Sequence, residues 1–345
     1  MKAKWGVLGC GGIARRRTIP EGIAKASNAE LTAVMDTNTD AVHAVAKEFG
    51  ALACISEAEL LASDCDIVYL ATPVNLHLAQ AKRAAEAGKH VFCEKPLGVT
   101  VDEASAMVNV CKANGVKLGT GLMMRFHAQH QAALEIVRGG RLGKPVFARA
   151  QLSCWYPPIE GAWRQDPAKG GGGSLADLGS HCLDLLEMFF GQIVRVSCSV
   201  ACLVHKYKSE DTAVVIAEFE NGARGVVDVL FNVPDASSRN RLELYGTQGC
   251  ILAEGTIGQG ELGEMTAYIE ESAKGYEAQQ ERVSGKSEVI SPAPVNMYRA
   301  EVEAFSQAVL DNAAPPQDGR IGLWNQKVMA ACYESARTGR AVEVG

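Results

Sequence analysis

An amine, an imidazole and a carboxylate in this chain have the residue types and surroundings for acid–base chemistry on an oxygen. The amine is Lys95, in the sequence Glu94-Lys95-Pro96 directly after the apolar stretch 90–93. If that stretch is a strand of an open parallel sheet, Lys95 lies outside the carboxyl ends of the strands, where such sheets bind ligands. Its ammonium group can then donate to a substrate hydroxyl and stabilise the alkoxide that forms as hydride leaves. The alternative is a solvated surface lysine.

The imidazole and the carboxylate are His181 and Asp177, which follow the glycine run 170–173. A spacing of four puts them on one face of a helix. A histidine whose tautomer and orientation are fixed by a carboxylate is a natural proton acceptor at neutral pH. Two other interpretations stay open: Asp177 could form a capping box with Ser174, and His181 could be a core histidine.

A glycine-rich turn near the start of the chain, Gly9-Cys10-Gly11-Gly12-Ile13-Ala14, fits the dinucleotide fingerprint Gly-x-Gly-x-x-Ala. The pattern follows the apolar stretch 4–8 and opens a helical stretch. Backbone N–H groups at that position, together with the helix dipole, can hold a pyrophosphate. We therefore expect Gly9, Gly11, Gly12 and Ile13 to bind a dinucleotide. The alternative is an ordinary tight turn between a strand and a helix.

Asp36 ends the second predicted strand, 30–35, where a carboxylate can accept both ribose hydroxyls of the adenosine. The same charge repels the extra phosphate of NADP, and Thr37-Asn38 supply no cation to offset it. NAD is therefore the expected cofactor, and NADP is the less favoured one. The counter-argument is Arg15–Arg17, which could interact with a phosphate unless they form a solvated helix face.

Strands and helices alternate through the first 125 residues or so. The pattern predicts strands over 4–8, 30–35, 66–71, 90–93 and 117–123, and helices from 14 to 26 and over 39–49, 75–87 and 101–113. Strands that alternate with helices of this length form βαβ units and a parallel sheet.

Beyond residue 125 the pattern changes. It predicts a helix over 127–139, a strand over 145–155, a loop rich in Pro and Gly, a helix over 175–190, strands over 193–204, 212–220, 223–231 and 241–246, and helices over 297–310 and 322–337. Asn221-Gly222, between two of these strands, is a strong hairpin signal. Successive hairpins indicate an antiparallel sheet, so the second half is α+β. Residues 254–292 are polar and carry no clear pattern.

The composition argues against several classes of protein. The 345 residues carry a net charge of −6 and no basic run longer than Arg15–Arg17, so nucleic-acid binding is not expected. No apolar run reaches the length of a membrane span, and no secretory signal is visible. The 11 cysteines are scattered without ligand spacing, which predicts no metal site and reduced thiols in a cytoplasmic protein.

Four motifs resemble those of the Gfo/Idh/MocA oxidoreductase family, which includes glucose–fructose oxidoreductase and inositol dehydrogenases. They are the glycine turn 9–14, Ala71-Thr72-Pro73-Val74-Asn75-Leu76-His77, Glu94-Lys95-Pro96, and Gly172-Gly173-Ser174-Leu175-Ala176-Asp177-Leu178-Gly179-Ser180-His181. The resemblance extends to Glu334-Ser335-Ala336-Arg337-Thr338-Gly339. Each motif is of modest specificity, and their shared order and spacing carry the resemblance.

The resemblance implies an NAD-binding Rossmann domain over residues 1–125 and an α+β domain over residues 126–345. The second domain would have a large open, mainly antiparallel sheet, bind the substrate and mediate a homodimer or homotetramer, with C-terminal helices able to pack back on the first domain. The resemblance also implies that Lys95, Asp177 and His181 are the catalytic group.

Further site residues are implied in the same way. Thr72, Pro73, Asn75, His77 and Glu94 would line the cofactor cleft, with Glu94 near the nicotinamide ribose. Substrate contacts would come from Tyr156, Trp163 and Arg164, in the loop where the family pattern is loosest, and from Arg125 after the sixth strand. Trp163-Arg164 resembles the members that oxidise sugars and cyclitols, in which aromatic and cationic groups meet a ring and its hydroxyls. The alternative is that this pair anchors a packed loop.

The expected function is hydride transfer between NAD and a secondary alcohol or ketone of a sugar, a glycoside (oxidised at position 3, for example) or an inositol. His181, oriented by Asp177, would take the hydroxyl proton while Lys95 stabilises the oxygen. Two other functions stay open: reduction of a non-sugar carbonyl or imine, and a non-catalytic NAD-binding sensor.

Overall fold

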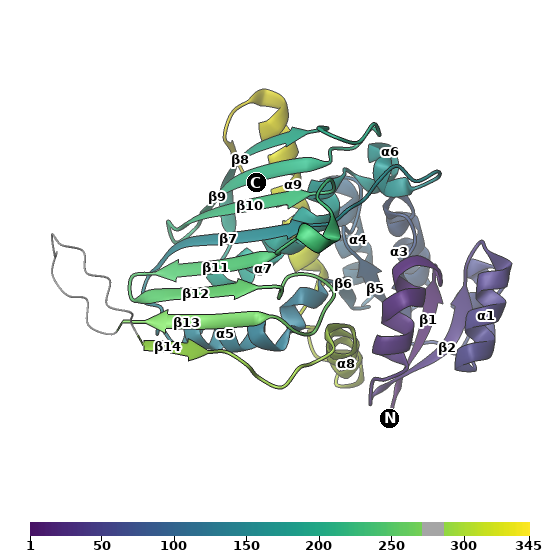
Figure 1. The fold of residues 1–345 in the computed structure, drawn as a ribbon. Helices are drawn as coiled ribbons and strands as arrows, with labels where there is room; N and C mark the ends of the chain where they lie inside the picture. The colour runs from purple at the N-terminus through teal and green to yellow at the C-terminus, as the bar shows by residue number, and fades with distance from the viewer. Residues whose placement is uncertain (271–285) are drawn as a thin grey trace, which may run out of the picture. The chain divides into compact units, whose positions relative to one another are not determined.

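The computed structural model describes residues 1–270 and 286–345, which divide into two units (Figure 1). The first unit comprises residues 1–123, 161–172 and 296–327. The second unit comprises the other described residues of 124–160, 173–295 and 328–345. Two segments distant in sequence, 161–172 and 296–327, therefore belong with the N-terminal residues.

The first unit is built on a parallel sheet of six strands in the order β3-β2-β1-β4-β5-β6. The strands are β1 (Ala3–Leu8), β2 (Ala29–Met35), β3 (Leu52–Ala53), β4 (Ile67–Leu70), β5 (His90–Glu94) and β6 (Leu118–Gly121). The chain leaves β1 and β4 in opposite directions across the sheet, so the ends of these two strands form the switch point at which such sheets bind ligands. The expected parallel sheet is confirmed.

The connections between these strands are helical. They are η1 (Ala14–Ile23), α1 (Thr39–Phe49), α2 (Glu57–Ala62), η2 (Val74–Leu76), α3 (His77–Glu86) and α4 (Val101–Ala113). The helices α1 and α4 have the predicted bounds because their ends carry strong local signals. Asn38 and Thr100 each accept a backbone N–H of the first turn, and Gly50 ends α1 in the left-handed conformation.

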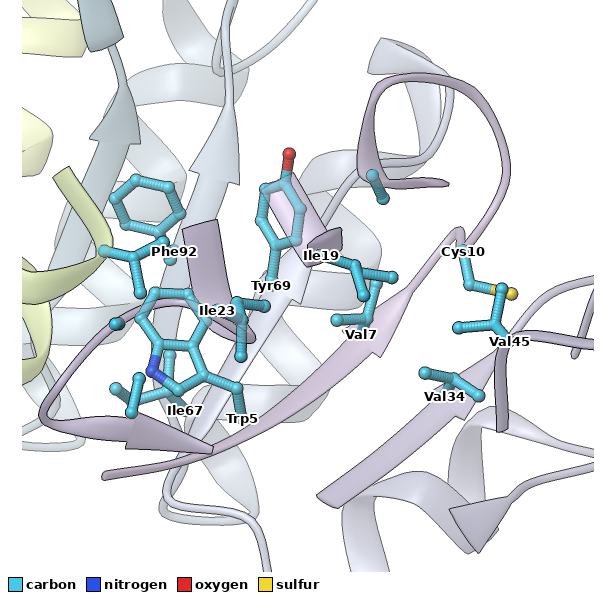
Figure 2. Close-up of a cluster of buried hydrophobic side chains, with 14 of the residues drawn as sticks. Trp5, Val7, Cys10, Ile19, Ile23, Val34, Val45, Ile67, Tyr69 and Phe92 are labelled. Atoms are coloured by element: carbon cyan, nitrogen blue, oxygen red, sulfur yellow. The ribbon is translucent and has the colours of Figure 1, made fainter. Parts of the chain in front are cut away.

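An aromatic cluster closes one face of the first sheet (Figure 2). Trp5, Phe92 and Phe305 meet with ring centroids 5.1–6.0 Å apart. Phe305 belongs to α8 (Met297–Leu310), and the Trp5 indole donates to Ser306 of the same helix at 3.0 Å. Buried rings with satisfied polar tips supply a large part of a core's stability, so α8 is integral to this unit. The short helices η4 (Trp163–Gln165) and α6 (Pro167–Gly170) complete it.

The second unit contains a sheet of nine strands in the order β14-β13-β12-β11-β7-β10-β9-β8-β15 (Figure 1). Its strands are β7 (Pro145–Ser153), β8 (Ile193–Ala201), β9 (Thr212–Phe219), β10 (Arg224–Leu230), β11 (Arg241–Gly246), β12 (Gly249–Glu254), β13 (Glu264–Ile269), β14 (Lys286–Val289) and β15 (Val342–Glu343). Among the described strands of this second sheet, only β10 and β7 pair in parallel. The mainly antiparallel sheet and the hairpin at Asn221-Gly222 are confirmed.

One face of this sheet is covered by helices α5 (Ala128–Arg138) and α7 (Ser180–Phe190) (Figure 1). The segment η5 (Leu175–Gly179) runs directly into α7, and α9 (Gly319–Thr338) has residues in both units. On the opposite face, Val214, Ile216, Leu252 and Tyr268 are exposed. The sheet is therefore open on one side.

Several short elements were not predicted from the sequence: β3, α2, β12, β13, β14 and β15. Each has only two to six residues, so a hydrophobic period covers too few positions to identify the element. The helix α9 begins at Gly319, three residues earlier than predicted. In the part of the chain that is described, no helix combines the length and apolar character needed to span a membrane.

Candidate active site

The glycine turn between β1 and η1 depends on residues without a side chain. Gly9 has φ +87°, and a Cβ there would lie 2.7 Å from the carbonyl oxygen of Ala71, so any other residue would displace the neighbouring strand end. Gly12 has φ +48°, and a Cβ built on it meets no atom within 4 Å. The turn therefore brings backbone close to open space at the start of a helix. This geometry fits a bound pyrophosphate.

Asp36, at the end of β2, is fixed beside this turn. One carboxylate oxygen accepts the backbone N–H of Gly11 at 3.1 Å, and the other accepts that of Asn38 at 3.0 Å. The carboxylate is thereby tied to the glycine turn on one side and to the start of α1 on the other. A ribose next to the turn would meet an oriented acceptor, so the residues present fit the adenosine half of a dinucleotide.

The loop after β4 contains Thr72, Pro73 and Asn75, and His77 begins the following helix. Asn75 is exposed, and Thr72 donates its hydroxyl to Gln80. His77 is fully buried, with Nε2 3.0 Å from the Thr72 carbonyl oxygen and Nδ1 3.1 Å from that of Pro96. Burial lowers the pKa of His77, whereas the hydrogen bonds to the Thr72 and Pro96 carbonyl oxygens raise it. The imidazole lies between the two loops that carry these carbonyl groups. A direct contact between His77 and the cofactor stays a prediction.

Glu94, at the end of β5, accepts a hydrogen bond from a hydroxyl group that is itself held by a second hydroxyl. The Tyr69 hydroxyl donates to Glu94 Oε1 at 2.5 Å, and Thr18 Oγ1 lies 3.0 Å from the same Tyr69 oxygen. Because Tyr69 gives its hydrogen to Glu94, Thr18 is the donor to Tyr69. The Tyr69 ring lies in the core cluster while its hydroxyl points out of it (Figure 2). Three elements of the first unit thus fix one carboxylate next to Lys95.

Burial and neighbouring cations change the pKa of Glu94 in opposite directions. Burial raises its pKa, whereas the Tyr69 hydrogen bond and the charges of Lys95 and Arg164 lower it. Lys95 is half-buried, and its peptide bond to Pro96 is cis. Arg164 stacks on Trp163, with the guanidinium carbon 4.2 Å from the ring centroid. The charge of Arg164 therefore acts on Glu94 as that of Lys95 does, although Arg164 lies about 70 residues further along the chain.

Asp177 and His181 lie in the second unit, on the continuous helical segment formed by η5 and α7. Asp177 is half-buried, and His181 is 7% exposed. Ser174 makes no side-chain cap hydrogen bond, so the capping box considered from the sequence is not formed. The structure therefore does not support the interpretation in which Asp177 and Ser174 cap the helix together. The spacing of four on one helix face remains the basis for pairing the two side chains.

Arg125 and Tyr156, both in the second unit, have partners within the protein. The Arg125 guanidinium forms a bidentate ion pair with Asp184, with three N···O distances of 2.7–2.9 Å. Tyr156 packs on Phe231 with ring centroids 4.9 Å apart, and its carbonyl accepts the Tyr207 hydroxyl. Asp184 is 1% exposed, and the removal of either charge from a buried pair is costly. Substrate contacts by Arg125 and Tyr156 stay predictions.

The first unit also contains a buried acid that the sequence analysis missed. Glu301 of α8 is 1% exposed, and its Oε2 has no hydrogen-bond partner within the described residues. Burial, and to a lesser extent the charge of Glu94, raises its pKa well above the usual value. Tyr298, one turn earlier, has a buried hydroxyl that likewise lacks a partner in the described part of the chain. Glu301 therefore keeps its proton at pH values where exposed glutamates are ionised.

Replacing Glu301 by Gln should make the protein more stable at neutral pH, and the gain should grow as the pH rises. The native state holds the Glu301 proton more tightly than the unfolded chain, in which the pKa is near 4.5. Wild-type stability therefore falls as the pH rises above that value, until the folded pKa is reached. A neutral Gln does not titrate. Thermal unfolding between pH 5 and pH 8.5 measures the difference.

The exposed Glu135 of α5 provides the matched Glu→Gln control, for which we expect no gain that grows with pH. If Glu301→Gln were instead less stable than wild type at pH 8, the buried group would be an ionised carboxylate with a compensating partner.

The residues missed from the sequence share one property: their roles depend on contacts over long sequence separations. Glu301 had a usable signal, because it lies four residues from Met297 and from Phe305 on the apolar stripe of an amphipathic helix. Tyr69 is the single polar tip in an apolar strand. Glu210, which holds the start of the helical segment bearing Asp177, gave no signal in a polar loop.

The candidate site residues thus fall into two groups. The first unit contains the glycine turn, Asp36, the loop after β4, Glu94, Lys95, Trp163 and Arg164; the second contains Arg125, Tyr156, Asp177 and His181. In the described residues, no cluster of three or more His, Cys, Asp or Glu side chains could hold a metal ion. All eleven cysteines are free thiols.

Comparison with known proteins gives the same assignment for both halves of the chain. Residues 3–122 match the family model of an oxidoreductase family with an NAD-binding Rossmann fold, named GFO_IDH_MocA. Residues 130–252 match the GFO/IDH/MocA C-terminal domain.

Similar proteins extend over the full length. The chain is 29% identical to 1,5-anhydro-D-fructose reductase of Ensifer adhaerens, covering 99% of this chain and 98% of that protein. It is 30% identical to D-xylose 1-dehydrogenase (NADP(+)) 2 of Haloferax volcanii, covering 99% of each. The crystal structure of aldose-aldose oxidoreductase from Caulobacter crescentus, complexed with glycerol, superposes with a TM-score of 0.86 at 27% identity, covering 99% of this chain and 100% of that one. The chain therefore belongs to the Gfo/Idh/MocA family of oxidoreductases, with an NAD-binding Rossmann domain.

Proposed function

We propose that this protein catalyses NAD-dependent interconversion of a secondary alcohol and a ketone on a sugar, a glycoside or an inositol. The observation that carries the proposal is the support of Glu94-Lys95 at the end of β5. Tyr69 donates a hydrogen bond to the Glu94 carboxylate, and Thr18 holds the Tyr69 hydroxyl, in the sheet whose first turn has the geometry for a dinucleotide. Lys95 directly follows this strand. Open parallel sheets bind their ligands outside the carboxyl ends of the strands, so we expect its amine to lie in the ligand-binding cleft.

The reaction assigns each protein group a separate task. The nicotinamide, when bound, supplies the acceptor or donor of the hydride. His181, oriented by Asp177, takes the proton of the substrate hydroxyl as a general base. Lys95 donates a hydrogen bond to the same oxygen and stabilises the negative charge that develops on it. Glu94 supports Lys95 through opposite charge, and Tyr69 keeps that carboxylate in place.

The substrate class follows from the side chains offered and from the relatives. Trp163 presents an aromatic ring and Arg164 a cation, a combination suited to a ring with several hydroxyls. Two of the similar proteins are named for 1,5-anhydro-D-fructose and D-xylose, and a third is named for aldoses. A polyhydroxylated ring is therefore the substrate class we propose.

Reduced-nicotinamide absorbance, scanned over inositols, aldoses and aryl glycosides with NAD, tests the proposal. We expect turnover with at least one polyol class. Turnover only with a non-sugar carbonyl or imine would replace the substrate class. If NAD binds but no polyol reacts, the protein is a sensor rather than an enzyme of this kind.

We propose NAD rather than NADP as the cofactor. The Asp36 carboxylate is fixed beside the glycine turn, and we expect its charge to repel the extra phosphate of NADP. Arg15–Arg17 are the cations that would argue for NADP. Arg15 and Arg17 form ion pairs with Glu48 and Glu21 at 2.6 Å, and Arg16 is exposed. One relative is named for NADP, and the affinities for the two cofactors test the proposal.

Replacing Asp36 by Ala should weaken NAD binding by about tenfold or more, since charge-assisted hydrogen bonds contribute about 1.5–3 kcal/mol. Discrimination against NADP should fall in the same variant. Asp36→Asn is the comparison variant, because it removes the charge and keeps one oxygen as an acceptor, while its NH₂ group replaces the other of the two oxygens that accept the N–H groups of Gly11 and Asn38. Calorimetric Kd values for both cofactors measure these effects. Unchanged NAD affinity in Asp36→Ala would remove Asp36 from the binding site.

We also propose a homodimer or homotetramer that acts in the cytoplasm. The open face of the nine-stranded sheet supports self-association, because Ile216, Val226, Arg149, Glu243 and Leu252 form one cross-strand row on it. Light scattering coupled to size exclusion gives the oligomeric state. A monomer at micromolar concentration would contradict this proposal.

A further inference from the structure

Glu210 lies in the loop between β8 and β9 and is 8% exposed. Its Oε1 accepts three hydrogen bonds: from the backbone N–H of Gly173, from that of Leu175, and from the Tyr333 hydroxyl, each at 2.9 Å. Two of the donors belong to the start of the helical segment that bears Asp177 and His181. One carboxylate oxygen therefore joins this start to the loop before β9.

The main chain of Glu210 also contacts the helix start. We call the contacts between Glu210 and residues 173–175 the joint. Its carbonyl oxygen accepts the N–H of Ser174 at 3.0 Å. A Cβ added at Gly173 would lie 2.0 Å from that oxygen, so the close approach requires glycine. Three successive N–H groups, those of residues 173, 174 and 175, are thus satisfied by one residue.

These three N–H groups are the ones a helix start leaves without internal partners. The usual device is a side-chain cap at the first residue, but Ser174 makes no such bond. A distant residue performs the capping instead, so it fixes the position of the helix start as well as satisfying its donors. A carboxylate at this end also interacts favourably with the helix dipole.

We infer that Glu210 is a positioning residue for the reaction, which sets where the helical segment 175–190 begins and hence where His181 and Asp177 stand. The inference rests on the proposed function, in which His181 is the base. It assigns Glu210 no contact with substrate or cofactor. A displacement of about 1 Å in a catalytic group can lower turnover by about a hundredfold, so a loosened joint should affect the chemical step.

Replacing Glu210 by Ala should lower kcat by about tenfold to a hundredfold. The Kd for NAD should stay within about twofold, because residues that we assign to the dinucleotide are untouched. Glu210→Gln should restore most of the activity, since the Gln Oε1 can accept the same three hydrogen bonds. Steady-state kinetics at saturating NAD and substrate, with calorimetric NAD binding, provide the measurement.

Asp211→Ala is the matched control for the loss of a buried carboxylate. Asp211 is fully buried and accepts the N–H groups of Leu203, Val204 and His205, so it organises the loop before β9 and not the helix start. Asp211 orders the same loop that carries Glu210, but its removal leaves the Glu210 carboxylate and its three donors in the protein. We therefore expect this variant to lose thermal stability and to lower kcat per folded molecule much less than Glu210→Ala does. Gly173→Ala strains the joint from the other side without removing the carboxylate, and it should lower kcat as Glu210→Ala does.

The outcomes are separable. Wild-type kcat in a folded Glu210→Ala protein, or equal loss in Glu210→Gln and Glu210→Ala, overturns the inference. If Glu210→Ala does not fold, Gly173→Ala decides, and wild-type kcat in that variant overturns it as well. Wild-type turnover in His181→Ala would instead defeat the proposed function itself, whatever Glu210 does.

Discussion

Replacing Lys95 by Ala should lower kcat by about 10²–10³-fold, the range found when one donor to a developing oxyanion is removed. The Kd for NAD should change little, because the residues that we assign to the pyrophosphate and the ribose are in the glycine turn and at Asp36. Lys95→Met should be as inactive as Lys95→Ala, since it restores the length of the side chain without its charge. Single-turnover measurement of reduced nicotinamide separates this loss from a change in product release.

The control for this prediction lies at the other end of the same strand. Lys89 precedes β5, and its ammonium donates to the carbonyl oxygens of Ser63 and Cys65 at 3.0 and 2.7 Å. Lys89→Ala should cost stability and leave kcat close to wild type. If Lys95→Ala were to turn over substrate at the wild-type rate, Lys95 would be the solvated lysine that its residue type alone suggests, and the assignment of the cleft would fail with it.

How much of the fold the sequence could predict depends on how local the determining signals are. The bounds of α1 and α4 follow from caps at Asn38 and Thr100, which lie next to the helices they begin. The hairpin at Asn221-Gly222 is equally local, with Gly222 at φ +86°. Strands β12 to β15 are different, because their residues become strand only through pairing with β11, β13 or β8. Strands of two to six residues contain too few positions for a hydrophobic period to identify them.

The candidate site divides in the same way. Lys95 and the pair Asp177 and His181 could be selected because their types and spacing already suggest a chemistry. The residues that hold them could not: Tyr69 reaches Glu94 across 25 positions and Glu210 reaches Gly173 across 37. A buried hydroxyl or carboxylate supports a catalytic group because of where the fold places it. The same residue types occur at many solvent-exposed positions, so the type alone does not identify the supporting residue.

Replacing His181 by Ala should lower kcat by about 10²–10⁴-fold, which is the usual contribution of a general acid–base group. The alternative interpretation, that His181 is a core histidine, makes the opposite prediction: a loss of stability with normal turnover per folded molecule. The two interpretations are therefore separated by measuring kcat and thermal unfolding on the same preparation. Asp177→Asn should lower kcat less than His181→Ala, because the imidazole remains while its orientation and preferred tautomer are weakened.

His130 provides the matched control for His181, since it is a fully buried histidine of the same unit. Its Nδ1 lies 2.8 Å from the Met124 carbonyl oxygen, its ring meets Phe189 edge-on, and burial lowers its pKa to about 3. Such an imidazole stays neutral through the working range and is a weak base, so His130→Ala should destabilise the protein without lowering kcat. If both histidine variants lose stability and keep turnover, the base of this reaction lies elsewhere. If only His181→Ala loses turnover, burial alone cannot explain why a histidine stands at that position of the helix.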